Sequence, residues 1–457
     1  FLASLAYGGL RAPLGAGGGP LLSARAIFAI FALLSLVAVG AATWCAPRST
    51  LRLFVASIVH GIWRFRVRGL ERIPPSGPVV LVANHLSWLD GFLLPMASPR
   101  PVRMVVYGPN IRGRFLRMLS SRTGQLLGFK RGLEWLLEKV ESPLLPVSID
   151  GMWGSGLTFS EGRYFTKWPR LWRRTVTLSF GTPLPTGTHP DQARLALQEV
   201  AAQAVRRRMV ERRRGRAAGD EAAWLATAEA FDGCCMVRRG DRLLASLAAG
   251  DPLHESLGAH GGRLLGIHGT TLDAATPAEE IVVALARERS SLWLARIGQA
   301  AAAAEVAAPP ALPALEVVVL PIGSAAELPR ARAAAAAFAG RFGIEPVVAY
   351  APPDAGGLVA MNTPAKRVAW DHEALDKPDT VGRVVNGVVV WPHAADREPL
   401  GLESLASQGV TPGERRTLAI GATLPWPAGA AAAVEPRAAL LADAFDVDAD
   451  GFLVVRG

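Results

Sequence analysis

A short apolar run that ends abruptly in polar residues constrains the fold most. Residues 78–83 read PVVLVA, and Asn84, His85, Ser87 and Asp90 follow within seven positions. Apolar runs of this length, bounded by turn-forming residues, are typical of buried strands in α/β proteins. His85 and Asp90 would point about 140° apart on a regular helix, so they can meet only across a turn. The sequence therefore predicts a strand, a turn and a helix, with Ser87 placed to cap that helix.

A histidine and an aspartate joined by a turn could remove a proton from a hydroxyl group. His85 would accept the proton of an attacking alcohol, and Asp90 would fix the imidazole tautomer and stabilise its protonated form. The spacing alone does not support this hypothesis, because His268 and Asp273 repeat it. The second copy precedes the run 276–280 (TPAEE), an ordinary helix start, so we interpret it as a turn and a cap.

The surroundings of the first pair resemble a known enzyme family. The family's first motif, Asn-His-x-Ser-x-x-Asp, stands here as Asn84, His85, Ser87 and Asp90. Three further segments follow in the family's order: 123–132 (TGQLLGFKRG), 145–151 (LPVSIDG) and 175–184 (TVTLSFGTPL). On these matches, residues 60–186 resemble the glycerolipid acyltransferases, which include the 1-acyl-glycerol-3-phosphate acyltransferases.

The resemblance implies a membrane-bound enzyme of phospholipid synthesis. Such an enzyme moves a fatty acyl group from acyl-CoA or acyl carrier protein to the hydroxyl of a lysophospholipid or of glycerol phosphate. In that role His85 would be the base, Asp90 would orient it, and Asn84 and Ser87 would contact the substrate. The resemblance implies no metal and no other cofactor for acyl transfer.

The chain departs from the family in the two motifs that hold the substrate phosphate. The second motif, Gly-x5-Arg, is absent, and residues 118–121 (MLSS) stand where the Glu-Gly of the third is expected. The run 159–163 (FSEGR) imitates that motif out of order, and we interpret it as coincidence. Lys130 and Arg131 are the remaining candidates for an anion clamp, with a solvated helix start as the alternative. A catalytically dead membrane remnant is therefore a further hypothesis.

One uncharged apolar stretch predicts a transmembrane helix. Residues 26–46 contain no charged side chain, and about 20 apolar residues suffice to span a bilayer. Arg25 and Arg48 flank the stretch and Trp44 lies near one end, as at membrane interfaces, while a buried soluble helix is the alternative. The sequence does not begin with Met, and a single span after a loop looks like the end of a longer protein, so by analogy residues 1–48 would be the last helix of a fused transporter. The expected location is the bacterial inner membrane, with the catalytic domain in the cytoplasm.

The net charge of +10 is carried mainly by arginine. Two clusters, 206–208 and 212–214, are entirely arginine, and the run 168–174 mixes tryptophan with arginine. Beside a membrane helix, such groups favour anionic lipid headgroups as partners. An ordinary solvated helix face is the alternative for 206–214. No nucleic-acid-binding motif accompanies the arginines, so nucleic acid is not expected as a partner.

The second half of the chain has the pattern of another α/β domain. Beyond a polar, helical linker at 187–219, strand-like runs such as 315–320 (LEVVVL) alternate with alanine-rich helices such as 331–340. This alternation is typical of α/β folds. The low-complexity run 300–313 is predicted to be a loop or a boundary.

Over 315–457 the chain also resembles the adenylate-forming enzymes, which include the acyl-CoA synthetases. The matching segments are 342–350, 377–383 (KPDTVGR) and 448–453 (DADGFL). Asp354 replaces a longer acid of the family, and Asp443 keeps a nucleotide-binding position whose neighbours have changed. No glycine-rich phosphate loop followed by Pro-Lys-Gly occurs. We interpret this half as a degenerate adenylation core, which would use ATP and Mg²⁺ only if it were active.

The predicted fold class is α/β throughout. The predicted organisation is a membrane segment at 1–50, an acyltransferase domain at 51–186, a basic linker at 187–219 and the degenerate adenylate-forming domain at 220–457. The predicted function is membrane-bound acyl transfer. The main alternative is a bifunctional enzyme that activates a fatty acid in its second half and transfers it in its first.

Overall fold

The computed structural model is a mixed α/β protein. It describes residues 23–45, 59–103, 139–162, 174–212, 221–367, 379–392, 417–421 and 437–455, without Leu86, Trp88, Phe159 and Ala449 but with the isolated positions 53, 56, 57, 133 and 377. Contacts divide the chain into two compact units. The first is Phe1–Ile62 with Pro99–Pro101, and the second is Trp63–Ser98 with Val102–Gly457. Each is described by itself.

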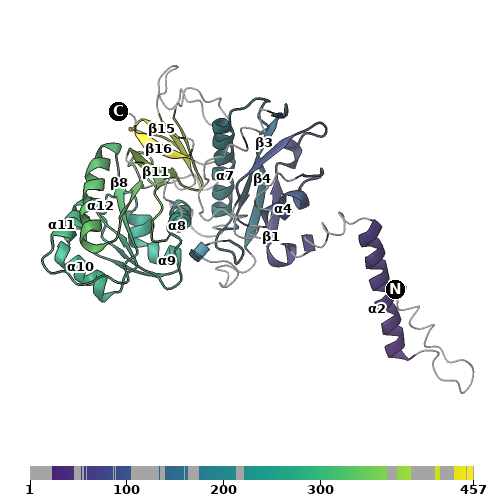
Figure 1. Ribbon diagram of the computed structural model, residues 1–457, viewed down its shortest axis with the longest axis horizontal. Helices are drawn as coiled ribbons and strands as arrows, with labels where there is room; N and C mark the ends of the chain where they lie inside the picture. Colours follow the sequence, from purple (N-terminus) through teal and green to yellow (C-terminus); the bar gives the residue numbers. More distant parts are fainter. Residues whose placement is uncertain are drawn as a thin grey trace, which may run out of the picture. The chain divides into compact units, whose positions relative to one another are not determined.

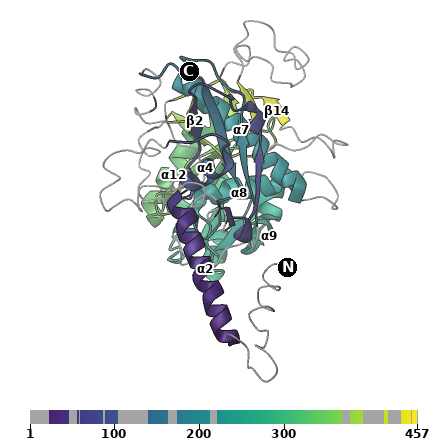
Figure 2. The same ribbon diagram turned by 90° about the vertical axis from the view of Figure 1, so that its right-hand side faces the viewer.

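The described part of the first unit contains helix α2 (Ala24–Cys45), drawn in purple in Figures 1 and 2. The hydroxyl of Ser23 accepts a hydrogen bond from the backbone N–H of Ala26 at 3.2 Å, which caps the first turn. Large apolar side chains along α2, such as Phe28 and Trp44, are exposed. The described helices include none long and apolar enough to cross a membrane. The helix predicted near 26–46 is thus present, but its prediction as a membrane span is not supported.

A four-stranded sheet begins the second unit. Its strand order is β1-β4-β3-β2, with β1 at Arg64–Arg68, β4 at Thr175–Phe180, β3 at Leu144–Asp150 and β2 at Val80–Ala83. β2 runs parallel to β3, and β3 runs antiparallel to β4. Every residue of β3 is buried. The predicted strands at 78–83 and 175–184 are therefore confirmed, and the polar turn after Ala83 lies at the end of a parallel pair.

A nine-stranded sheet forms most of the second half (Figure 1). Its order is β15-β16-β11-β10-β9-β8-β7-β5-β6. The strands are β5 Arg242–Ala245, β6 His268–Thr271, β7 Leu292–Leu294, β8 Val317–Ile322, β9 Val347–Tyr350, β10 Ala360–Met361, β11 Thr380–Val384, β15 Phe445–Val447 and β16 Phe452–Val455. Strands β6, β5, β7, β8 and β9 pair in parallel, and the remaining pairs of this sheet are antiparallel.

Helices connect the parallel strands, as parallel pairing requires. They are the π-helix η4 His254–Ala259, α9 Gly261–Leu265, α10 Ala278–Arg287, α11 Ile297–Glu305 and α12 Leu328–Phe342, whereas α8 Glu221–Cys235 precedes β5. The strand predicted at 315–320 and the helix predicted at 331–340 are confirmed as β8 and α12. The prediction of a loop over 300–313 is wrong for its first residues, which belong to helix α11. Alanine has the highest helix propensity, and α11 packs against α12.

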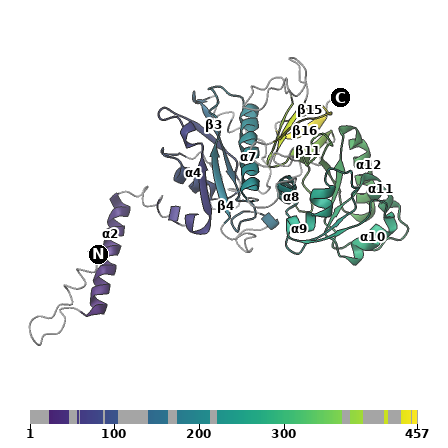
Figure 3. The same cartoon turned by 180° about the vertical axis from the view of Figure 1, so that it is seen from behind.

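Helix α7 (Pro190–Arg212) contacts both halves of the second unit (Figure 3). It packs on β2, β3 and β4, and also on α8 and on a three-stranded sheet of β12 Val388–Trp391, β13 Leu418–Gly421 and β14 Arg437–Leu440. Ala193, Leu197 and Ala202 of α7 are fully buried. The predicted linker is thus helical, as expected, but this helix is a buried element rather than a polar tether.

Gly387 explains how closely the chain approaches α7. Its φ is +87°, and a Cβ atom added there would lie 3.3 Å from Cγ1 of Val205 on α7. Glycine accepts this left-handed backbone without a steric cost, and it leaves room for the valine. The turn before β12 can therefore pack directly on the helix.

Candidate active site

The site begins at Asn84, directly after β2. Its side-chain oxygen accepts a hydrogen bond from the backbone N–H of Ile149 at 2.6 Å, and its side-chain nitrogen donates to the carbonyl of the same residue at 2.9 Å. Asn84 is buried, so these bonds extend the β2–β3 pairing by one polar side chain. The structure thus gives Asn84 a positioning role, and its contact with substrate stays a prediction.

Ser87 and Asp90 build the turn that brings the dyad together. The carboxylate of Asp90 accepts from the backbone N–H of Ser87 at 2.8 Å and from the Ser87 hydroxyl at 3.1 Å. That hydroxyl also accepts from the backbone N–H of Leu89 at 3.1 Å. Helix α4 (Asp90–Ala97) then begins with Leu89 at its N-cap. The prediction that Ser87 caps this helix is wrong, because its hydroxyl is used inside the turn.

The structure brings His85 and Asp90 into direct contact. Nδ1 of His85 lies 3.1 Å from Oδ2 of Asp90. The His85 side chain is 40% exposed, whereas that of Asp90 is 5% exposed. When Nδ1–H donates to the carboxylate, the neutral ring carries its lone pair on Nε2. The arrangement therefore joins a buried, oriented acid to a base that reaches the surface.

The connection from β3 to β4 also reaches this site, which the sequence analysis missed. Thr158 forms an isolated antiparallel bridge with Ser87, and both residues are fully buried. Glu161, three residues on, is 6% exposed and has a left-handed backbone at φ +61°. Such a conformation costs a non-glycine residue on the order of 1–3 kcal/mol and is found most often at functional sites. The described part of the run 159–163, Ser160–Gly162, therefore follows closely on a residue that contacts the dyad turn, although we interpret the run as a coincidental match.

The second His-x4-Asp copy has a different structure. His268 begins β6 and is exposed, and Oδ1 of Asp273 accepts from the backbone N–H of Ala275 at 2.7 Å. Helix α10 starts at Ala278 after Pro277. The predicted turn is therefore confirmed for this copy, but the predicted cap is wrong, because Pro277 stands at the N-cap of α10 and no side chain caps it.

The basic residues predicted to bind the substrate phosphate or lipid headgroups differ in where the structure places them. Lys130 and Arg131 lie outside the described residues. Arg206 is 2% exposed, and Arg208 donates to Asp150 from Nε at 2.6 Å and from Nη2 at 3.1 Å. Burial by itself lowers the pKa of Arg208, but Asp150 and Glu229 outweigh it and raise that pKa. Protein encloses the side chains of Arg206 and Arg208. For these two arginines, the prediction of a solvated helix face and the prediction of a lipid-binding cluster are therefore both wrong.

The second half places Asp443 in a small polar cluster beside the ends of β8 and β9. Its carboxylate accepts from the Tyr350 hydroxyl at 2.7 Å, from the Ser324 hydroxyl at 3.1 Å and from the backbone N–H of Ala325 at 2.9 Å. Burial, and then the bond to Asp443, raise the pKa of Tyr350. Asp354 is exposed in the turn that follows β9. In this structure Asp443 thus accepts hydrogen bonds from Ser324, Ala325 and Tyr350, at the position where the resemblance implies a bound nucleotide.

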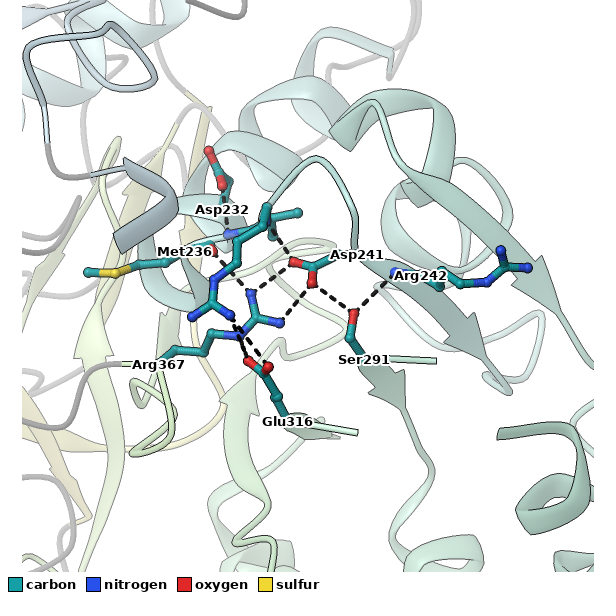
Figure 4. Close-up of polar contacts among 9 residues, drawn as sticks. Asp232, Met236, Asp241, Arg242, Ser291, Glu316 and Arg367 are labelled. Atoms are coloured by element: carbon teal, nitrogen blue, oxygen red, sulfur yellow. Dashed lines mark hydrogen bonds and ion pairs between the residues drawn. The ribbon is translucent and has the colours of Figure 1, made fainter. Parts of the chain in front are cut away.

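A buried ionic network supports the core of this half (Figure 4). Both terminal nitrogens of Arg367 donate to the carboxylate of Asp241 at 2.8 Å, and its Nε lies 2.5 Å from Glu316. The Arg367 side chain is fully buried. Burial would raise the pKa of Asp241, but the bonds from Arg367 lower it overall. Ser291 donates a further hydrogen bond to Asp241 at 2.8 Å.

Comparisons with known proteins concern both halves. Residues 64–127, which include the His85–Asp90 pair, match the family model described as Acyltransferase. No curated protein matches the chain.

Several solved structures share parts of the fold. They include an anthranilate CoA ligase in complex with anthranoyl-AMP, at 15% identity, a TM-score of 0.38 and coverage of 51% of this chain and 43% of that one. The N-terminal domain of FACL13 from Mycobacterium tuberculosis is 17% identical, with a TM-score of 0.39 and coverage of 51% of this chain and 55% of that one. A benzoate CoA ligase from Burkholderia xenovorans is 16% identical, with a TM-score of 0.39 and coverage of 52% of this chain and 45% of that one. This chain thus spans about half the length of these proteins.

Proposed function

We infer that this chain, which carries an acyltransferase-family segment at residues 64–127, transfers an acyl group to a hydroxyl. The observation that carries this proposal is the 3.1 Å contact between His85 and Asp90 inside that segment. A buried carboxylate that orients an exposed imidazole can take a proton from an alcohol. The proposed donor is an acyl thioester of CoA or of acyl carrier protein. The proposed acceptor is a lysophospholipid or glycerol phosphate.

The proposed reaction uses the dyad twice. Nε2 of His85 removes the proton of the acceptor hydroxyl while the oxygen bonds to the thioester carbonyl carbon. The tetrahedral intermediate then collapses, the carbon–sulfur bond breaks, and the leaving thiolate takes the proton back from His85. Asp90 holds Nδ1–H and stabilises the imidazolium that forms between the two steps.

The proposed setting is a bacterial inner membrane, with lipids as partners and the catalytic part in the cytoplasm. Exposed apolar side chains of α2, such as Phe28, Leu33 and Leu36, support contact with lipid, because large exposed apolar patches mark interaction surfaces. The full chain is expected to float with phospholipid vesicles in a density gradient. Sedimentation of the chain apart from the vesicles would remove this part of the proposal.

The test of the transfer reaction is the movement of radiolabelled acyl groups to a lysophospholipid by membranes that contain the full chain. His85→Ala is expected to lower the rate by about 10²–10⁴-fold, the usual contribution of a general base. His268→Ala is the matched control, since it removes the other histidine of the same spacing and is expected to leave the rate unchanged. Transfer that survives His85→Ala would exclude the dyad.

A bifunctional synthetase and acyltransferase is the second candidate. It is favoured by the position of Ser324 and Tyr350, which follow or end the parallel strands β8 and β9 and hold Asp443. The carboxyl ends of parallel strands are where open α/β sheets bind ligands. This candidate requires fatty-acid-dependent exchange of pyrophosphate with ATP in the presence of Mg²⁺. Without such exchange, the second half has no adenylating role.

A further inference from the structure

A cavity lies between the β3–β4 connection and helices α8 and α9. Its volume is about 560 Å³, within the usual range for small-molecule sites. The first half contributes residues at both ends of the connection, and the second half contributes one face of α8 and the end of α9. The lining residues used below are Trp153, Arg174, Leu225, Asp232, Arg239 and Arg263.

Two carboxylates line the cavity, on Glu229 and Asp232. Asp232 is 4% exposed and accepts from Nε1 of Trp153 at 3.1 Å and from the backbone N–H of Val237 at 3.0 Å. Glu229, the other carboxylate of the lining, pairs with Arg208 at 2.7 Å. Both carboxylates are therefore already bonded to groups of the protein.

Three guanidinium groups line the same cavity, on Arg174, Arg239 and Arg263. That of Arg174 donates to the backbone carbonyl groups of Gly151, at 3.1 Å, and of Trp153. Arg239 is exposed, and the Arg263 side chain is 57% exposed while it pairs with Glu221 at 3.0 Å. Guanidinium groups that reach solvent at the edge of a cavity are suited to bidentate bonds with phosphate oxygens. The polar part of the cavity thus favours an anion.

The rest of the lining is apolar. Leu225, Leu264, Leu265 and Ile267 contribute aliphatic side chains, and the Trp153 ring is fixed by its bond to Asp232. Leu225 and Leu265 are already buried in the core, and a phosphate ion alone would leave the half-buried Leu264 and Ile267 without a ligand contact. A ligand that combines a phosphate with an apolar chain or arm would bury both kinds of surface.

The cavity is connected to the dyad through one short segment. Trp153 lies three residues after Asp150, the last residue of β3, and Gly151 and Gly154 on either side of it have φ values of +86° and +79°. The same segment continues to Thr158, which bridges to Ser87 beside Asp90. A ligand bound against Trp153 would therefore contact the segment that also bridges to Ser87 in the dyad turn.

We propose that this cavity binds a phosphate ester joined to an apolar chain or arm, held by Arg239 and Arg263 and packed against Trp153. The inference rests on the proposed function, because both its donor and its acceptor have this chemistry: CoA carries phosphates on a pantetheine arm, and lysophosphatidate carries a phosphate on an acylated glycerol. It also supplies the anion site that the missing sequence motifs left unassigned.

The test measures equilibrium binding of three probes to the full-length His85→Ala protein: CoA, lysophosphatidate below its micelle concentration, and inorganic phosphate. The double variant Arg239→Ala/Arg263→Ala is expected to weaken binding of CoA or of lysophosphatidate by about tenfold or more, since hydrogen bonds to charged groups contribute on this order. Arg287→Ala is the control, because that side chain is 70% exposed on α10 and does not line the cavity. A second variant, Leu264→Trp, fills the apolar part without changing charge and is expected to weaken the same probe.

The probe that loses affinity identifies whether the donor or the acceptor occupies the cavity. Equal affinity in the double variant and in Arg287→Ala would overturn the inference, as would binding of phosphate as tight as that of the larger probes. Because binding is measured without His85, the result is independent of catalysis. Transfer activity that depends on His85 but not on these arginines would leave the proposed function standing and remove the cavity from it.

Discussion

Asp90 and Asp443 are two aspartates held near strand ends, one in each half of the second unit, and they are bonded in different ways. Both accept hydrogen bonds from a hydroxyl and from a backbone N–H. Among the described contacts, Asp90 also binds the ring of His85, which is 40% exposed, whereas Asp443 also accepts from the buried hydroxyl of Tyr350. The two aspartates therefore differ in what they hold: Asp90 orients an imidazole that reaches solvent, whereas Asp443 binds a hydroxyl enclosed by the protein.

The largest expected effect comes from Asp90→Asn, which replaces the carboxylate that contacts His85. The amide cannot accept from Nδ1–H and from Ser87 in the same way, so the tautomer and orientation of His85 are lost. We expect acyl transfer to fall by about 10²–10⁴-fold, as for loss of a general base. Asp443→Asn is the matched control and should leave the transfer rate unchanged. Equal losses in both variants would show that the two acids do not differ in role.

The next largest effect concerns the stability of the second half. Arg367→Met leaves Asp241 buried without its main partner, which typically costs about 3–5 kcal/mol of unfolding free energy. Denaturant unfolding measures it, and Arg287→Met on the exposed face of α10 should change the free energy by less than about 0.5 kcal/mol. A similar small change in Arg367→Met would mean that the network in Figure 4 contributes little to stability.

A pH dependence follows from the same network. The pKa of Asp241 is lowered in the folded protein by Arg367, so the stabilisation is complete above the unfolded pKa and is lost as the pH falls through the folded one. We expect the unfolding free energy to decrease from about pH 4 downward, since a free aspartate titrates near 3.9. In Arg367→Met this part of the acid dependence should disappear. An unchanged slope would assign the acid sensitivity to other carboxylates.

The smallest expected effect is that of Tyr350→Phe. It removes one of three donors to Asp443, and such a hydrogen bond contributes about 0.5–1.5 kcal/mol, or somewhat more when its acceptor is charged. Denaturant unfolding should show a loss of this size with acyl transfer unaffected. A loss as large as that of Arg367→Met would show that Asp443 is as important to the fold as Asp241.

Local patterns in the sequence predicted the strands well. The apolar run before Asn84 became β2, and the alternation beyond residue 315 became β8 and α12, because each pattern is decided by neighbours in the chain. The meeting of His85 and Asp90 also depends on a turn of a few residues, so it could be inferred from the sequence around them.

The contacts that sequence could not give are those between distant residues. Thr158 reaches Ser87 across 71 positions, and Arg208 joins Asp150 to Glu229 from a helix that reads as polar. An arginine-rich run has the same composition whether it faces water or a buried carboxylate, so only packing decides between these alternatives. The polar bonds around Asp443 likewise depend on strands that are far apart in sequence.

Helix α7 has a consequence for the inheritance of this protein. A gene fusion normally joins two parts that could once fold alone, and a later recombination can separate them again at the junction. Here the segment between the two resemblances is the helix that covers strands of both, with Val205 fitted against Gly387. Recombination within 187–219 would leave each product with an uncovered sheet, so we expect the two halves to have evolved as one heritable piece since they acquired this helix.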